Sequence, residues 1–131
     1  MIKGTTGYKP IEMPFRLHTS VQKIALPTAE GMQFEDLNQI VYLEASGNYT
    51  YIHFADARRI LICKTLHEMA KKLEQPLRFV RIHRSSIINM TYLKKYVKGK
   101  GGYVVLENDI SLAVSSGQKS LFIEAIRQVF R

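Results

Sequence analysis

The chain has 131 residues, of which 46% are hydrophobic and 23% charged, and its formal net charge is +8. These values fit one soluble globular domain, exclude two domains of ordinary size, and leave no apolar run long enough to span a membrane. Cys63 is the only cysteine, which excludes an intramolecular disulfide and a cysteine-clustered zinc site. We expect it to be a small core residue.

Residues 1–20 are rich in Gly, Thr and Pro and show no sustained period, which predicts a flexible lead-in or linker before one domain over residues 21–131. The first residues lack the apolar segment of a secretory signal, so a cytoplasmic location is expected. Strands are predicted from Val21 to Leu26, closed by Pro27, and around Met32 to Phe34.

A β-hairpin is predicted next, because Ile40–Ala45 and Tyr49–Phe54 are rich in β-forming residues and Ser46-Gly47-Asn48 between them favours a tight turn. The pleat of a strand places Tyr49, Tyr51 and His53 on one face and Thr50, Ile52 and Phe54 on the other. A further turn leads into a predicted strand over residues 59–64.

The hydrophobic period then changes to that of a helix. Thr65-Leu66-His67-Glu68 has the form of a capping box. Apolar residues follow at helical spacing and predict a buried stripe on a short helix that Pro76 stops: Leu66, Met69, Ala70 and Leu73. His67 lies off this stripe and is expected to be solvated.

The basic part of the chain opens with the segment from Arg78 to Asn89. Between Gln75 and Leu106 there is no Asp or Glu, whereas seven residues are basic: Arg78, Arg81, Arg84, Lys94, Lys95, Lys98 and Lys100. Residues 1–55 carry four Lys or Arg against five Asp or Glu, a net of −1, and residues 56–131 carry fifteen against six, a net of +9. This asymmetry indicates a surface that faces a polyanion, with nucleic acid as the first candidate and a generally basic protein as the alternative.

Two more strands are predicted at Tyr92–Val97 and Tyr103–Leu106, joined by Lys98-Gly99-Lys100-Gly101-Gly102. This glycine-rich turn either lets the backbone approach phosphates or is a hairpin turn with solubilising lysines. After a strand over residues 110–114, Ser115 or Ser116 is expected to cap a terminal helix with an apolar stripe. About ten short strands and two helices without βαβ alternation predict a mostly β, antiparallel architecture.

No enzyme motif is present, and neither a cofactor nor a metal is expected. The four histidines, His18, His53, His67 and His83, have no partner at metal-ligand spacing, and no serine lies in a Gly-x-Ser-x-Gly elbow. His53 and His83 have the chemistry for acid–base cleavage of RNA, but their positions in strands favour packing or hydrogen bonding.

Four blocks of the sequence, in this order, resemble the LytTR DNA-binding domain of bacterial transcriptional regulators: residues 40–49, residues 64–66, residues 79–85 with Ile88-Asn89, and Val114-Ser115. The resemblance runs from about Val21 to the C-terminus. It implies an elongated β fold whose loops enter successive major grooves on one side of a duplex. It also implies the output half of a response regulator in a two-component phosphorelay, with an N-terminal receiver domain outside this chain and a homodimer on direct repeats of DNA.

Carried over by position, the DNA-contacting places of the family fall on three segments: Gly47, Asn48 and Tyr49; His83, Arg84 and Ser85; and the residues that follow Val114, beginning with Ser115. Members of the family commonly have an arginine after the Val-Ser pair, where this sequence has Ser116. Either Lys119 reaches the DNA instead, or this contact is weaker.

The chemistry of each side chain indicates whether it contacts a base or a phosphate of the DNA. Arg84 can read O6 and N7 of guanine with two hydrogen bonds, whereas Lys94, Lys98 and Lys100 suit phosphates, which position without specifying. Asn89 is counted among the DNA contacts and is also expected to tie down a turn.

The predicted function is sequence-specific binding of double-stranded DNA. One alternative is a basic β-rich domain that binds or cleaves RNA, for which Tyr49 and Tyr51 are the evident stacking residues. Another is a basic face that docks an acidic protein.

Overall fold

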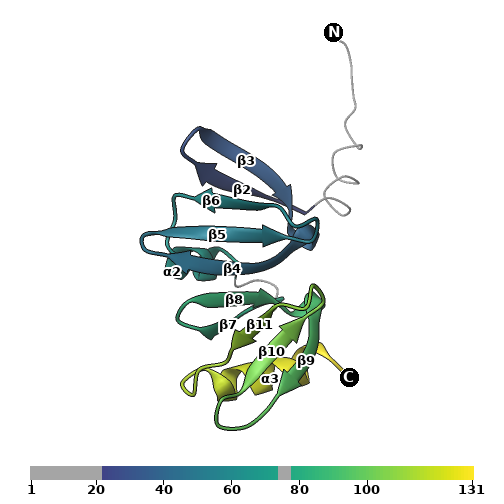
Figure 1. The fold of residues 1–131 in the computed structure, drawn as a ribbon. Helices are drawn as coiled ribbons and strands as arrows, with labels where there is room; N and C mark the ends of the chain where they lie inside the picture. Colours follow the sequence, from purple (N-terminus) through teal and green to yellow (C-terminus); the bar gives the residue numbers. More distant parts are fainter. Residues whose placement is uncertain (1–21, 74–77) are drawn as a thin grey trace.

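The structure of the chain is a computed structural model, and it describes residues 22–73 and 78–131. The ten described strands form three antiparallel sheets, accompanied by two α-helices (Figure 1). The expectation of a mostly β, antiparallel fold is thereby confirmed. The predicted lead-in over residues 1–20 and the predicted helix stop at Pro76 lie outside the described residues.

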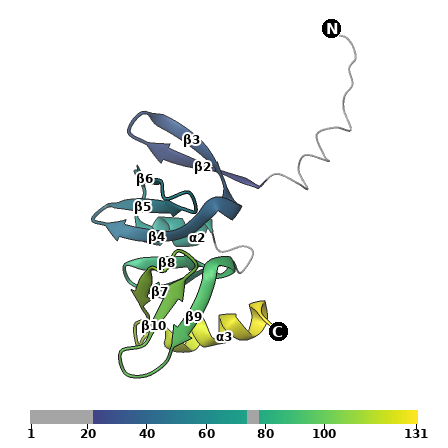
Figure 2. The same cartoon turned by 45° about the vertical axis from the view of Figure 1, so that its right-hand side comes forward.

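Three sheets follow one another along the long dimension of the molecule (Figures 1 and 2). A hairpin of β2 (Lys23–Thr28) and β3 (Gly31–Asp36) forms the first. The second has five strands in the order β6-β5-β4-β8-β7, with the bounds Ile40–Ser46 for β4, Tyr49–Phe54 for β5, Arg59–Ile62 for β6, Phe79–His83 for β7 and Ser86–Asn89 for β8. The third has the order β11-β10-β9, with the bounds Leu93–Val97 for β9, Tyr103–Leu106 for β10 and Ser111–Ala113 for β11.

Helices cover the sheets. Helix α2 (Leu66–Lys72) packs on the five-stranded sheet, and α3 (Lys119–Val129) lies against β7 and the three-stranded sheet. Two 3-10 turns, η1 (Leu37–Gln39) and η2 (Met90–Tyr92), lead into β4 and β9.

The five-stranded sheet buries both of its faces because its central strands alternate between two cores. Leu43 and its cross-strand neighbour Ile52 belong to the core under α2 and the β2–β3 hairpin. Tyr42 and its neighbour Ile88 belong to the core shared with the three-stranded sheet and α3. The five-stranded sheet therefore lies between the two hydrophobic cores and joins the two halves of the molecule.

The predicted faces and the predicted cap of α2 are confirmed. Thr50, Ile52 and Phe54 are buried, and the opposite face of β5 is partly exposed. Thr65 Oγ1 accepts the backbone N–H of Glu68 at 3.1 Å, and Glu68 Oε1 accepts that of Thr65 at 2.9 Å, which closes the capping box.

Three local predictions are wrong. Pro27 does not close the first strand, because β2 continues to Thr28 and Pro27 pairs with Met32. Helix α3 has Gln118 at its N-cap position with no side-chain cap bond, so neither Ser115 nor Ser116 caps it. Cys63 is exposed and not in the core, because the edge strand β6 ends at Ile62, which is the residue that packs, and Cys63 follows in a bend. Among the described residues, no helix is long and apolar enough to cross a membrane.

Candidate nucleic-acid interface

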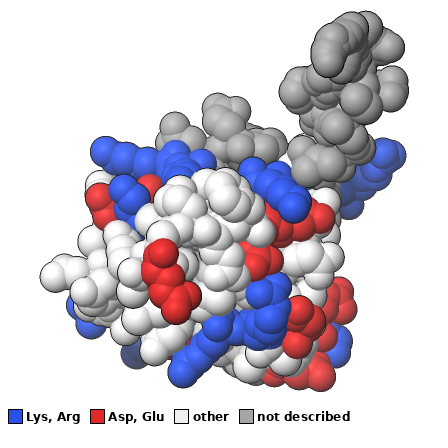
Figure 3. Space-filling model, turned by 90° about the horizontal axis from the view of Figure 1, so that it is seen from above, with Lys and Arg blue, Asp and Glu red and all other residues white. Residues whose placement is uncertain are grey.

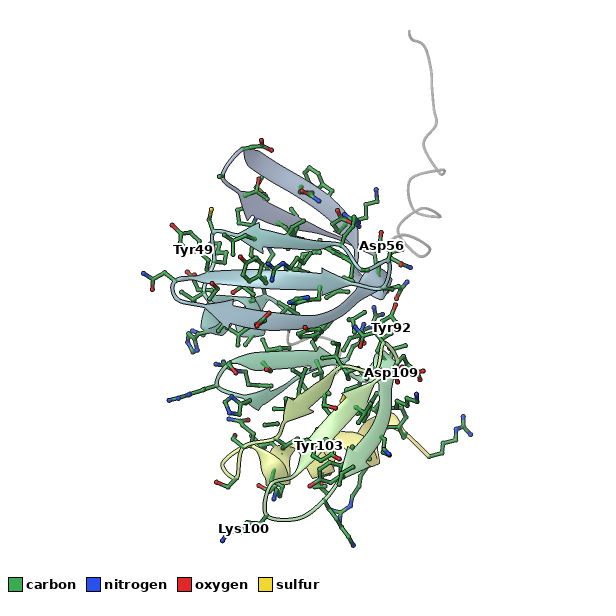
Figure 4. The ribbon with its side chains drawn as sticks, viewed as in Figure 1. Tyr49, Asp56, Tyr92, Lys100, Tyr103 and Asp109 are labelled. Carbon is green, nitrogen blue, oxygen red and sulfur yellow. The ribbon has the colours of Figure 1, made fainter. Side chains whose placement is uncertain are left out.

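Three connections gather along one edge of the molecule, on the left in Figures 1 and 2: the β4–β5 turn at Gly47 and Asn48, the β7–β8 turn at Arg84 and Ser85, and the β11–α3 segment over residues 114–118. In Figure 4, Tyr49 marks this edge, whereas Asp56, Tyr92 and Asp109 lie at the opposite edge. The three segments predicted to contact DNA are thus brought to the same side. We call them the three loops.

The β4–β5 turn is a tight connection of two exposed residues. Gly47 has a φ of +60°, a left-handed conformation that glycine adopts without strain. Ser46 and Tyr49 are cross-strand partners, so they close the turn, and Tyr49 leaves it 48% exposed. The tip of the turn therefore consists of two residues with small side chains, and the aromatic side chain of Tyr49 stands at its base.

The β7–β8 turn is braced from within. Arg81 donates from Nε to the carbonyl oxygen of His83 at 2.9 Å and from Nη2 to that of Arg84 at 2.6 Å. His83 Nδ1 accepts the backbone N–H of Ser85 at 3.1 Å and lies 2.9 Å from Ser85 Oγ. The Arg84 side chain is exposed, and no hydrogen bond or ion pair joins it to another described residue.

Backbone hydrogen bonds connect the three loops. The N–H of Ala45, two residues before the first turn, donates to the carbonyl oxygen of Ser85 at 3.0 Å. The N–H of Ser115 donates to the carbonyl oxygen of Ile82 at 2.9 Å. Strand β7 and its turn are consequently the centre to which the other two loops are attached.

The β11–α3 segment is also fixed to the three-stranded sheet. The N–H of Val114 donates to the carbonyl oxygen of Gly102 at 3.0 Å, and that of Gln118 donates to the carbonyl oxygen of Ser115 at 3.0 Å. Ser116 is exposed at the bend. Its hydroxyl stands where the resemblance placed an arginine, so this loop presents a short neutral side chain.

Lys119 connects the third loop with the glycine-rich β9–β10 loop. Its Nζ donates to the carbonyl oxygen of Gly99 at 2.9 Å, and Gly99 has a φ of +127°. Lys98 and Lys100, on either side of Gly99, are exposed. These two lysines are therefore anchored next to the third loop, and Figure 4 shows Lys100 at the lower tip of the molecule.

Asn89 and Lys94 are not brought to the three loops. Asn89 has no exposed surface: its Nδ2 donates to Ile40 O at 2.8 Å and its Oδ1 accepts the N–H of Thr91 at 3.0 Å. The prediction of a DNA contact at Asn89 is corrected, because both amide atoms are occupied in the interior. Lys94 Nζ lies 2.9 Å from Asp109 Oδ1, at the opposite edge in Figure 4, and this bond raises the pKa of Lys94.

Tyr51 and His53, two of the residues suited to RNA, are engaged in contacts within the fold. The guanidinium of Arg59 lies 4.1 Å from the ring centre of Tyr51, which covers one face of that ring. His53 stacks on Tyr42 at 4.1 Å and bonds to Glu44 at 2.8 Å. Of the two tyrosines predicted to stack on bases, only Tyr49 keeps a large exposed surface. Within the described part of the chain, no three His, Cys, Asp or Glu side chains are grouped as metal ligands.

The end of the molecule formed by β2 and β3 carries both signs of charge, as Figure 3 shows from above. Arg58, in the β5–β6 connection, reaches Glu35 Oε1 at 3.0 Å and Asp56 Oδ2 at 2.8 Å. These bonds lower the pKa of Glu35 and of Asp56, in each case chiefly through the hydrogen bond from Arg58. Mixed charge of this kind is typical of an ordinary solvated surface.

Arg81 is the residue whose role sequence reasoning missed. It belongs to the basic window of the sequence, although its guanidinium is turned to two carbonyl oxygens of its own chain. The only signal in the sequence is its place between Val80 and Ile82 in a strand, which favours burial of its stem but does not name its partners.

Comparisons with known proteins identify the family and the fold. The family described as the LytTr DNA-binding domain matches residues 30–127. The CO-responsive transcriptional regulator RcoM of Rhodospirillum rubrum is 29% identical over 99 residues, which are 75% of this chain and 41% of RcoM. The chain thus matches less than half of that relative's length.

A solved structure, described as the LytTr DNA-binding domain of a putative methyl-accepting/DNA response regulator from Bacillus cereus, superposes with a TM-score of 0.64 at 22% identity. The superposition covers 79% of this chain and 95% of the other. At this level of identity, the likeness demonstrates the shared fold.

Proposed function

Because this chain belongs to the LytTr DNA-binding domain family, we propose that it binds double-stranded DNA sequence-specifically as the output domain of a bacterial transcriptional regulator. The observation that carries the proposal is the convergence of the three loops on one edge, joined through Ser85 and Ile82 by backbone hydrogen bonds. A row of exposed turns on a rigid sheet suits insertion into successive major grooves along one side of a duplex.

Each loop has a chemical role in this proposal. Arg84 reads guanine O6 and N7, because its fork is exposed and has no described partner within the fold. Gly47, Asn48 and Tyr49 contact the neighbouring groove, together with His83 and Ser85 at the base of the Arg84 turn. Ser115 and Ser116 contact DNA from the third loop, where they bring less positive charge than an arginine would. Lys98 and Lys100 bind phosphates.

Regulation and assembly complete the proposal. RcoM is a transcriptional regulator, and the Bacillus cereus protein is described as a response regulator. We infer that this chain also regulates transcription and that it works in the cytoplasm, beside an N-terminal receiver domain of a phosphorelay, as a homodimer on direct repeats. The alternative of an RNA-binding or RNA-cleaving domain is less well supported, because Arg59 occupies one face of Tyr51.

Selection of bound duplexes from a random DNA pool tests the proposal. We expect an enriched motif with two half-sites, and competition by single-stranded RNA that is weak at the same salt concentration. Recovery of duplexes without any shared motif, or stronger competition by RNA than by the enriched duplex, contradicts sequence-specific DNA binding. The spacing of the half-sites separately tests the homodimer.

A further inference from the structure

We propose that Arg81 is a positioning residue: it sets the conformation of the β7–β8 turn, and so the discrimination between bases by Arg84, without touching DNA. The inference rests on the proposed function, since it concerns how Arg84 is presented to the duplex. Of the seven basic residues in the acid-free window, Arg81 then has its role inside the fold and not at the DNA.

The geometry of Arg81 fits two acceptors at once. Its Nε and Nη2 donate to the carbonyl oxygens of His83 and Arg84, at 2.9 and 2.6 Å, which are consecutive carbonyls of the turn. A planar guanidinium holds its donors in a fixed fork, so it can fix the relative orientation of two peptide groups. An ammonium group presents its donors from one atom and does not impose the same geometry.

The surroundings of Arg81 also point inward. Among the described residues no carboxylate pairs with it, and burial lowers its pKa, although an arginine stays protonated at neutral pH. Arg81 is one of the residues that line a cleft of about 330 Å³ between β7 and α3, together with Val80 and Ala125. The cation is thus partly desolvated, and the two carbonyls are its described polar contacts.

Arg81 and His83 together bind the backbone and the serine of the turn, whereas the Arg84 side chain has no described partner. His83 Nδ1 accepts a hydrogen bond from the N–H of Ser85 and lies within hydrogen-bond distance of the Ser85 hydroxyl. Arg81 donates to two carbonyl oxygens of the turn. The Arg84 side chain remains exposed. Turning carbonyl oxygens toward Arg81 also keeps their negative ends away from phosphates. The turn is therefore pre-organised before DNA arrives, which reduces the ordering cost of binding.

Arg78 provides a matched control near the start of the same strand. Its Nη1 and Nη2 donate to Asn38 Oδ1 at 2.8 Å and Gln22 Oε1 at 2.9 Å, so it is an internally bonded arginine that does not contact the β7–β8 turn. Replacing either arginine removes the same charge. Only replacement of Arg81 is expected to affect how Arg84 is presented.

The experiment compares the full chain with Arg81→Gln, Arg81→Lys and Arg78→Gln, each checked by a thermal melt. Affinity is measured for the selected duplex and for a random duplex over a range of salt concentrations. Amide hydrogen exchange is measured at Ser85 and Ala45, whose N–H groups are bonded to the turn.

We expect Arg81→Gln and Arg81→Lys to lower the preference for the selected duplex about 10-fold to 100-fold, the range for one bidentate base contact. The salt dependence should not change, and exchange at Ser85 should become faster. Arg78→Gln should keep both the preference and the slow exchange. Rescue by Arg81→Lys combined with a flatter slope in Arg81→Gln, by about 0.9, means that Arg81 binds a phosphate and overturns the proposal.

Two further outcomes also overturn it: a full preference in a folded Arg81→Gln protein, and a reduced preference with unchanged exchange at Ser85. If Arg81→Gln does not fold, Arg81→Lys decides on the same readouts. If the unmodified chain itself shows no preferred duplex, the proposed function fails, while the exchange at Ser85 still decides whether Arg81 holds the turn.

Discussion

The ammonium group of Lys119, in the first turn of α3, donates a hydrogen bond to the carbonyl oxygen of Gly99, 2.9 Å away in the β9–β10 loop. This contact joins a residue next to the third loop with the backbone between Lys98 and Lys100. Lys119 thus brings a basic side chain to this place and holds the loop at the same time.

We therefore expect Lys119→Gln to act largely through Lys98 and Lys100. The single variant should weaken binding to all duplexes, and its effect should shrink when Lys98 and Lys100 are already alanine. A double-mutant cycle measured by titration of a labelled duplex checks this, since coupled residues show non-additive free energies. Strict additivity would show that Lys119 contacts DNA independently of the loop.

Lys98→Ala and Lys100→Ala should each weaken binding to every duplex alike, because a lysine on a phosphate neutralises charge without reading a base. Removing one lysine–phosphate pair should flatten the plot of log K against log salt by about 0.9. Lys94→Ala is the matched control, because Lys94 is paired with Asp109 at the other edge, and it should leave the slope unchanged. A change of preferred sequence in Lys98→Ala would assign that residue to a base.

Arg84→Ala should lower affinity for the selected duplex by about 1–3 kcal/mol while barely changing affinity for random DNA. Arg84→Lys keeps the charge without the bidentate fork, so it should restore non-specific binding more fully than discrimination. Binding is measured by fluorescence anisotropy beside a thermal melt. A folded Arg84→Ala protein that still prefers the selected duplex to the same extent would exclude Arg84 as a base reader.

Leu66→Ala and Leu73→Ala should each reduce the free energy of unfolding by about 2–5 kcal/mol, because both side chains are only 3% exposed in the core under the five-stranded sheet. His67→Ala, on the exposed side of the same helix, is the control and should have little effect. Chemical denaturation measures all three. Equal stability of Leu66→Ala and the unmodified chain would contradict the packing of this helix face on the sheet.

Stability should fall in acid partly through Glu35. Its hydrogen bond from Arg58 lowers its pKa below the usual 4.5, so the folded state favours the ionised carboxylate. The sign follows from linkage: this contribution is complete above the unfolded pKa and disappears as pH falls through the lower folded pKa. Melting temperatures of the unmodified chain and Glu35→Gln should differ near neutrality and converge in acid. A difference that persists at low pH would assign the effect to packing.

Regular local patterns made much of the fold predictable from the sequence. The alternation along Tyr49–Phe54 follows from the pleat, and the Thr65–Glu68 capping box depends on residues three positions apart. Both are short-range properties. The order of blocks indicated the family, which then implied where the three loops would meet.

Predictions failed where the outcome depends on segments distant in the sequence. Residues 60–63 are uniformly apolar, so nothing in them shows that the edge strand ends at Ile62 and leaves Cys63 exposed in the bend that follows. The acid-free window is also a linear property: folding brings Asp109 to Lys94 from outside it. Asn89 bonds to Ile40, 49 residues earlier, a contact that a single sequence does not reveal.

The bonds from Ala45 to Ser85 and from Ser115 to Ile82 use only backbone atoms. The distances between the three loops are therefore insensitive to which side chains stand at Asn48, Arg84 and Ser116. On the proposed function, a few substitutions at these tips would change the preferred DNA sequence, while the scaffold that spaces the three loops stays unchanged. Ser116 in place of an arginine is then one such substitution, made on a backbone scaffold that stays the same.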